Sequence, residues 1–329
     1  AYDDPKTLLQ NWDKAMDGVS ELLGYPPAER NRTVLYQQVD VQIRHGVNGI
    51  GYPQINNSYD PSKAEAGNSR HWLLTDPTQF EVDYHELGHA QLMSKFRGET
   101  EALVNFPHAY VRNVKFGVDF DLAFQQSMGP SHGTPGVTPD DAAIHWMVTE
   151  NFRNGREMDY SNTTKNEFRY QQRGYAKYAD IYRLFGWEPL RKFYGQENLD
   201  SMRNTPSDGL DEVDSRILRL SVAAGADLTP LIHFWGIFPV NPTLLKQKLT
   251  QAGIGPSEAV RAHIARYRNI APRNNVDFNA LYERMFPGRP GGESPDNGPG
   301  WFDVWRDRFN DTHGAQIRAQ VDAILNRYF

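Results

Sequence analysis

The feature that most constrains the fold of this chain is the run His85-Glu86-Leu87-Gly88-His89. On an α-helix, residues four positions apart lie on the same face, so both imidazoles can bind one metal ion. The carboxylate of Glu86 projects beside that face and can contact a water molecule held by the metal. The chain must therefore form a helix here and bring a further ligand opposite it. Such a centre is typical of enzymes that hydrolyse peptide or amide bonds.

A catalytic zinc site needs a third protein ligand, and the residues after the motif limit the choice. A third histidine six residues further on is excluded, because that position is Lys95. A glutamate on a following helix remains, and we expect Glu101, because Asn105 shares its helix face four residues later. The amide oxygen of Asn105 could accept the outer N–H of a metal-bound histidine. Glu99 is followed at the same spacing by Leu103 and is expected to cap its helix or face water.

Two chemical roles remain to be filled at such a centre. Glu86 would be the general base, taking a proton from the attacking water and passing it to the leaving amine. The tetrahedral oxyanion needs a hydrogen-bond donor besides the metal. The sequence leaves four candidates open for contact with the oxyanion or the substrate: His145, His108, Tyr110 and Tyr175.

Composition excludes several classes of protein. The 329 residues suffice for one large domain or two smaller ones. The absence of cysteine excludes thiol catalysis, cysteine-bound zinc and disulfides, and leaves the compartment open. A net charge of −6 without a basic block argues against nucleic acid as a partner. No apolar run approaches the roughly 20 residues that span a bilayer, and no signal peptide begins the chain. We expect a monomer that acts on a protein or glycoprotein.

The periodicity of apolar residues predicts a strand-bearing front and a helical remainder. Asp4-Pro5 predicts a helix start, and Gly24 its end. Alternating residues over 33–43 predict one or two strands, and 71–74 a further short one. Helices are expected at about 81–96, from Glu99 or Thr100 until Pro107 kinks or ends the helix, and then at about 140–153, 167–184, 187–194, 210–224, 243–252, 256–268 and 278–285.

These elements predict an α+β fold with a small N-terminal β-region, a helix pair that carries the zinc site and a mainly helical C-terminal part. The catalytic domain would comprise residues 1–286, with its β-containing part at about 1–80 and its helical part at about 81–286. The stretch 287–300 is rich in proline and glycine and is the predicted linker. Residues 301–329 would form a helical segment that packs back on the domain.

The motif and its surroundings resemble the enhancin-like gluzincins, the M-sixty family of peptidases. Their pattern of His-Glu-x-x-His followed by Gly-x-x-Glu-x-x-x-Asn is matched at 85–89 and 98–105. Further similarity lies in Gly-Ile-Gly-Tyr-Pro at 49–53, in the Phe-Gly-Trp region at 179–190, and in the Asp-Leu-Thr-Pro and Trp-Gly segment at 218–239. The resemblance also favours Glu101 as the third ligand.

The resemblance implies a gluzincin-like zinc endopeptidase, secreted by or displayed on a bacterial cell, that cleaves O-glycosylated, mucin-type proteins. Two alternatives stay open. The chain could be a general zinc peptidase without dependence on glycans, or a non-catalytic module that binds glycans or proteins and keeps the metal for structure only.

Overall fold

The computed structural model describes most of the chain, apart from several segments in its first hundred residues and a few later ones. The described residues are 4–26, 37–39, 47–48, 54–57, 84–85, 88–89, 95–127, 136–160, 167, 172–203, 208–288, 302 and 304–329. Glu86, the predicted strand at 71–74 and residues 289–300 of the predicted linker lie outside them.

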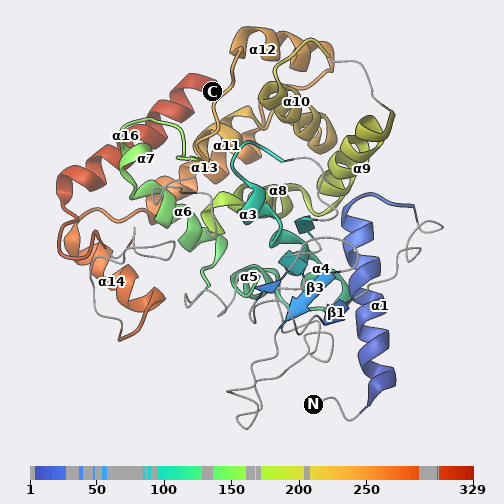
Figure 1. The fold of residues 1–329 in the computed structure, drawn as a ribbon. Helices are drawn as coiled ribbons and strands as arrows, with labels where there is room; N and C mark the ends of the chain where they lie inside the picture. The colour runs from blue at the N-terminus through green and yellow to red at the C-terminus, as the bar shows by residue number, and fades with distance from the viewer. Residues whose placement is uncertain are drawn as a thin grey trace.

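Helix α1 (Pro5–Leu22) confirms the first predicted helix. Asp4 caps it by accepting a hydrogen bond from the backbone N–H of Lys6, and proline occupies the first turn, where no donor is needed. Its apolar stripe, which includes Trp12 and Val19, is buried. Helix α1 packs along α4 (Phe106–Phe116) at one side of the molecule (Figure 1).

The predicted α+β class is wrong, because helices make up most of the described structure and only three very short strands accompany them. These strands are β1 (Gln37–Val39), β2 (Val47–Asn48) and β3 (Gln54–Asn57), in the order β1-β3-β2. Strand β1 runs parallel to β3, and β2 runs antiparallel to it. Strands of two to four residues cannot form a layer that buries a core, whereas the described core residues lie mainly on helices.

The remainder is helical, as its periodicity predicts. After α1, the helices are α3 (Thr100–Leu103), α4, α5 (Phe120–Gln125), α6 (Pro139–Met147), α7 (Glu150–Arg153), η5 (Gln172–Gly174, a 3₁₀ turn), α8 (Ala176–Phe185), α9 (Glu188–Arg203), α10 (Glu212–Ala224), α11 (Thr229–Phe234), α12 (Pro242–Gln251), α13 (Glu258–Ile270), α14 (Asn275–Met285) and α16 (Asp311–Tyr328).

Pro107 acts differently from the prediction that it would kink or end a helix. The helix that begins at Thr100 ends after one turn at Leu103, and α4 begins at Phe106 with Pro107 in its first turn. Proline suits this position because the first N–H groups of a helix have no partner within it. The expected single helix is therefore two helices, and the break lies just after Asn105.

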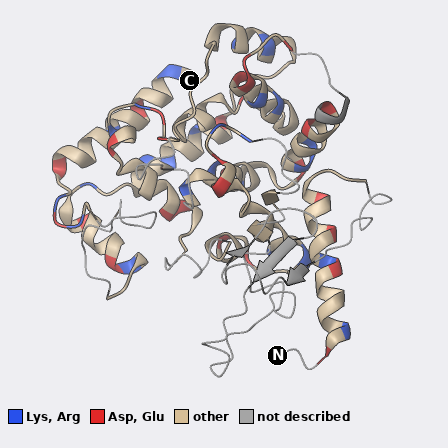
Figure 2. Cartoon of the chain, viewed as in Figure 1, with Lys and Arg blue, Asp and Glu red and all other residues tan. Residues whose placement is uncertain are grey.

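The last helix packs against the helical interior. Helix α16 contacts α7, α11 and α13, and its residues Ile317, Val321 and Ile324 are buried (Figure 1). The boundaries of the predicted catalytic domain, linker and C-terminal segment stay predictions. Positions of Lys and Arg are interspersed with positions of Asp and Glu along the described helices (Figure 2). Among these residues, no helix combines the length and the apolar character that crossing a bilayer requires.

Helix α8 lies at the centre of the helical part and is tied to its neighbours through a buried carboxylate. Asp180 is fully buried and accepts hydrogen bonds from Trp235 Nε1 at 2.7 Å and Tyr267 Oη at 2.5 Å. His263 Nε2 lies 3.0 Å from the same carboxylate. Because Trp235 follows α11 and the other two residues belong to α13, one side chain joins three helices.

We therefore expect Asp180→Ala to lower the free energy of unfolding by about 3–5 kcal/mol, because it leaves buried donors without an acceptor. Urea unfolding followed by circular dichroism measures this loss. Asp322→Ala is the matched control, since the ion pair of Asp322 with Arg268 is about half exposed and should contribute less than about 1 kcal/mol. Equal effects of the two substitutions would contradict the central role of Asp180.

Candidate metal centre

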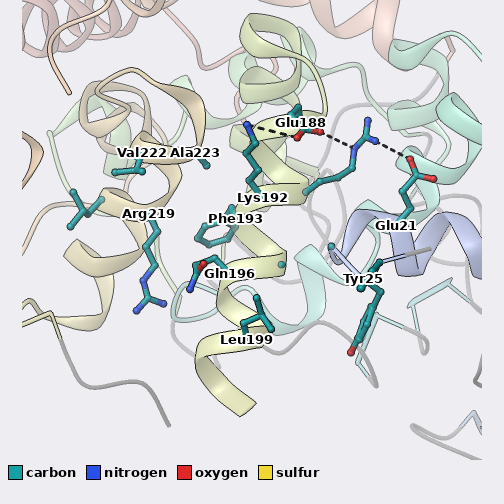
Figure 3. A pocket seen from close by; sticks show the side chains of 15 residues that line it. Glu21, Tyr25, Glu188, Lys192, Phe193, Gln196, Leu199, Arg219, Val222 and Ala223 are labelled. Carbon is teal, nitrogen blue, oxygen red and sulfur yellow. Dashed lines mark hydrogen bonds and ion pairs between the residues drawn. The ribbon is translucent and has the colours of Figure 1, made fainter. Parts of the chain in front are cut away.

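A groove of about 760 Å³ lies between the end of α1, α9 and α10 (Figure 3). Its charged side chains are paired at the rim: Arg191 Nη1 lies 2.9 Å from Glu21 Oε1, and Lys192 Nζ lies 3.8 Å from Glu188 Oε1. None of the residues that line this groove belongs to the cluster of metal-binding side chains described next. The groove therefore receives no catalytic assignment.

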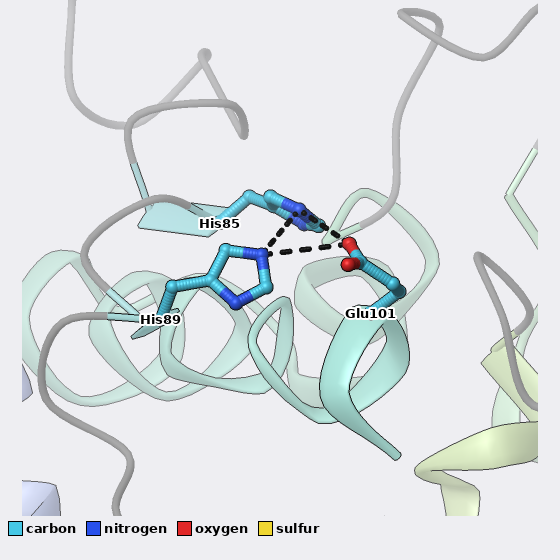
Figure 4. Close-up of side chains that lie close together, drawn as sticks. All are labelled: His85, His89 and Glu101. Carbon is cyan, nitrogen blue, oxygen red and sulfur yellow. Dashed lines mark hydrogen bonds and ion pairs between the residues drawn. The ribbon is translucent and has the colours of Figure 1, made fainter. Parts of the chain in front are cut away.

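Three side chains with metal-binding atoms converge on one point between the histidine segment and α3 (Figure 4). His85 Nε2 and His89 Nε2 are 3.1 Å apart. Glu101 Oε2 lies 3.3 Å from the first of these nitrogens and 3.4 Å from the second. The two histidines come from the segment of the His-Glu-x-x-His motif, and Glu101 comes from α3. Among the described residues, this is the group whose ligand atoms lie close enough together to hold a metal ion.

The spacing of these atoms fits a tetrahedral metal ion. Zinc binds histidine nitrogen and carboxylate oxygen at about 2.0–2.1 Å, so two ligand atoms of a tetrahedron lie about 3.3 Å apart. The three observed separations, 3.1, 3.3 and 3.4 Å, are close to that value. A donor set of two imidazoles and one carboxylate also leaves one tetrahedral position for a water molecule or substrate. The residues present therefore fit a catalytic metal ion.

Asn105 determines which nitrogen of His85 carries the proton. Its Nδ2 group donates to the backbone carbonyls of Glu101 at 3.1 Å and Ala102 at 3.0 Å. Its Oδ1 atom consequently faces His85 Nδ1 at 3.0 Å and must accept a hydrogen bond from it. A neutral His85 protonated at Nδ1 presents the lone pair of Nε2 to the centre, as metal binding requires.

Electrostatics keep the third side chain ionised. The pKa of Glu101 is held well below its usual range when the Nε2 atoms of His85 and His89 carry protons and donate hydrogen bonds to the carboxylate, although partial burial acts in the opposite direction. The side chain of Glu101 is 32% exposed, whereas those of His85 and His89 are 11% and 9% exposed. The carboxylate thus closes the side of the centre that is most open to solvent, and it is negatively charged at neutral pH.

Close packing fixes the histidine segment against α3. A Cβ atom at Gly88 would lie 2.5 Å from the carbonyl oxygen of Val104, so only glycine allows this approach. Tyr84, which precedes the first histidine, stacks on His108 of α4 with ring centroids 4.5 Å apart. Trp12 of α1 also stacks on Tyr84, with ring centroids 6.2 Å apart. Residues distant in sequence therefore hold the segment in place.

Two predictions about the glutamates have different outcomes. Glu86, the predicted general base, lies outside the described residues, and its role stays a prediction. Glu99 neither caps its helix through its side chain nor faces water. It is fully buried in an ion pair with Lys177 of α8. Sequence reasoning missed this pair, because Glu99 and Lys177 are far apart in the chain and no local spacing connects them.

The structure does not bring the four candidates for oxyanion or substrate contact into the metal-binding cluster. Each is buried and contacts other parts of the core. Tyr110 donates to Glu21 at 2.9 Å, and Tyr175 Oη lies 2.7 Å from Ser127 Oγ. His108 stacks on Tyr84, and His145 stacks on Phe302 with centroids 4.2 Å apart. These contacts support structural roles, which the residue types alone could not distinguish from catalytic ones.

Comparison with known proteins places the chain in a family. Residues 1–236 match the family described as Peptidase M60, enhancin and enhancin-like, and the chain belongs to that family. Glu101, which the sequence resemblance favours as the third ligand, is the glutamate that the structure brings to the two histidines. No solved structure matches the chain significantly.

Curated relatives are similar over the same part of the chain. TRPM8 channel-associated factor 2 of Bos taurus is 25% identical over 248 residues, which are 73% of this chain and 23% of that protein. The TRPM8 channel-associated factor homolog of Xenopus laevis is 25% identical over 243 residues, or 71% and 23%. The chain thus spans about a quarter of the length of these relatives.

We expect Gly88→Ala to separate the histidine segment from α3, because the added methyl group would overlap the backbone of Val104. Overpacking of this kind typically costs about 1–3 kcal/mol of stability. Zinc binding, measured by competition with a chromophoric chelator, should weaken at least tenfold, since metal sites tolerate only small shifts of their ligands.

Gly255→Ala is the control for Gly88→Ala, because a Cβ atom there has no neighbour within 4 Å. It should leave stability and zinc binding unchanged. Unchanged zinc binding in Gly88→Ala would contradict the close approach of the two segments.

Burial of histidines predicts an acid-sensitive fold. Burial lowers the pKa of His145 from 6.5 to about 3, and the charges of Arg173 and Arg284 act in the same direction. The unfolded chain therefore binds a proton below about pH 6.5 that the folded chain does not bind until about pH 3. Stability is complete above that window and should fall by roughly 1 kcal/mol per pH unit as the pH drops through it.

Urea unfolding between pH 7 and 5 tests this dependence. His145→Leu removes the titrating group, so the slope of stability against pH should become smaller in this variant. An identical slope in the variant and the parent protein would show that His145 does not titrate in this way.

Proposed function

We propose that this chain is the catalytic part of a zinc-dependent endopeptidase. The observation that carries the proposal is the convergence of His85, His89 and Glu101 at the separations of a tetrahedral zinc site. Membership of the enhancin-like peptidase family supports the same reaction class. The three side chains would hold the ion, and Asn105 would fix the ring of His85 through its Nδ1 proton.

The metal ion, Glu86 and Glu101 would have separate roles in peptide hydrolysis. A bound zinc ion would acidify the attacking water and polarise the scissile carbonyl group. Glu86 follows His85 directly in the sequence and would accept the proton of that water as general base. It would then return the proton to the nitrogen of the leaving amine. Glu101 remains a carboxylate at neutral pH and so keeps its negative charge for the metal.

The proposed substrates are O-glycosylated, mucin-type proteins outside the cell, on the basis of the family resemblance in the sequence. The alternative of a zinc peptidase without glycan dependence uses the same centre. A second alternative, a non-catalytic protein-binding module with a structural metal, is favoured by the names of the curated relatives, which describe proteins associated with a channel. The donor set of two histidines and one glutamate supports the catalytic proposal, because structural zinc sites usually have four protein ligands, whereas this set leaves one position for water.

We expect Glu86→Gln to abolish peptide cleavage and to retain zinc, because the amide cannot accept the proton of the attacking water but leaves the three ligands in place. The measurements are turnover of a peptide library and zinc content after gel filtration. Glu283→Gln, on α14, is a surface control that should retain full activity. A Glu86→Gln variant that keeps the activity and binding of the parent chain would favour the non-catalytic module.

Cleavage of a glycosylated and a deglycosylated substrate tests whether the peptidase activity depends on glycans. A mucin-type glycoprotein and its enzymatically deglycosylated form are incubated with the protein, with and without chelator, and the cut sites are mapped by mass spectrometry. We expect chelator-sensitive cuts beside glycosylated Ser or Thr in the first substrate only. Equal cleavage of both substrates would favour the general peptidase.

A further inference from the structure

The loop that leads to the third metal ligand is anchored by a buried charge. Glu99 is fully buried at the N-terminal boundary of α3, two residues before Glu101. Its Oε2 atom accepts a hydrogen bond from the backbone N–H of Phe96 at 2.8 Å and another from Tyr178 Oη at 3.0 Å. Its Oε1 atom forms an ion pair with Lys177 Nζ.

The partner of this charge is equally buried and belongs to the central helix. Lys177 is fully buried in the first turn of α8, where its Nζ atom also donates to the carbonyl of Gly174 in η5. Glu99 thus connects the loop before α3 with α8 and η5 at once. A buried ion pair contributes little net stability to a fold, because the cost of desolvating both charges offsets much of their attraction. Apolar residues of similar volume at the same positions often stabilise a protein equally well.

The geometry of α3 indicates that the Glu99–Lys177 ion pair positions this helical turn. A single helical turn is not stable by itself, so its position must come from contacts outside the helix. The carbonyl of Glu99 accepts hydrogen bonds from Ala102 at 2.9 Å and Leu103 at 2.8 Å, which forms the turn that presents Glu101. Asn105 holds the other end through the carbonyls of Glu101 and Ala102. The turn is therefore clamped at both ends.

We propose that Glu99, through its buried ion pair with Lys177, is a positioning residue that sets the place of Glu101 in the metal centre. This inference rests on the proposed zinc-dependent function. Removing residues that orient a ligand typically weakens metal binding about 10- to 100-fold. The pair would thus serve the geometry of the site more than the stability of the fold.

The double variant Glu99→Leu with Lys177→Met separates these two uses. It replaces both charges with apolar side chains and removes the contacts to Phe96 and Tyr178. We expect its thermal unfolding midpoint, measured after chelation, to equal or exceed that of the parent chain. Its dissociation constant for Zn²⁺ should rise about 10- to 100-fold. The visible spectrum of the Co²⁺-loaded protein should change, because that spectrum reports the coordination geometry.

A second double variant, Glu99→Gln with Lys177→Met, retains an oxygen acceptor for Phe96 and Tyr178 and should recover part of the Zn²⁺ affinity. This second variant also tests the positioning role if the first variant fails to fold. Asp180→Asn is the matched control, since it removes another buried charge from α8; it should lower stability and leave Zn²⁺ affinity unchanged. Zn²⁺ affinity within about twofold of the parent in the double variants would overturn the proposal.

Two outcomes distinguish this proposal from the function on which it rests. Zn²⁺ binding by the parent chain, with loss in Glu101→Gln but not in either double variant, would overturn the positioning role alone. A parent chain that binds no Zn²⁺ would overturn both the positioning role and the zinc peptidase.

Discussion

Three electron-rich atoms pointing at one another form the constraint on which the rest of this site depends. Two imidazole nitrogens and a carboxylate oxygen lie within 3.1–3.4 Å of each other. Without a positive charge between them, the lone pair of His85 Nε2 and the carboxylate of Glu101 would repel each other. Because Asn105 keeps the proton of His85 on Nδ1, a cation at the centre relieves that repulsion most directly.

The surrounding structure holds these atoms together against that repulsion. The absence of a side chain at Gly88 lets the histidine segment contact α3 backbone to backbone. Tyr84 joins the segment to α1 and α4 by ring stacking, and Glu99 joins α3 to α8. The centre therefore draws on α1, α3, α4 and α8, of which α1 and α8 are far from the others in the sequence. This explains why one short turn can present a ligand with a defined geometry.

Features of this chain that depend on neighbouring residues were predictable from the sequence, whereas features that depend on distant segments were not. The spacing of Glu101 and Asn105 suggested that both would face the metal centre, and the structure brings both to the histidines. Asp4-Pro5 and Gly24 marked the two ends of α1 correctly, since capping is a local property. The prediction of an α+β class was wrong, because a short alternating pattern does not show how many residues of a strand pair with a neighbouring strand. His145 and Tyr175 are buried in contacts with the core, which residue type alone does not show.

By itself, the sequence determined the spacing of the two histidines, the pairing of Glu101 with Asn105 and the ends of many helices, because each depends on residues within a few positions of one another. Only the tertiary structure decided that Glu99 is buried against Lys177, that Gly88 touches Val104, and that the candidate donors belong to the core. These facts depend on which distant segments pack together, and the burial of a charge is settled only when that packing excludes water.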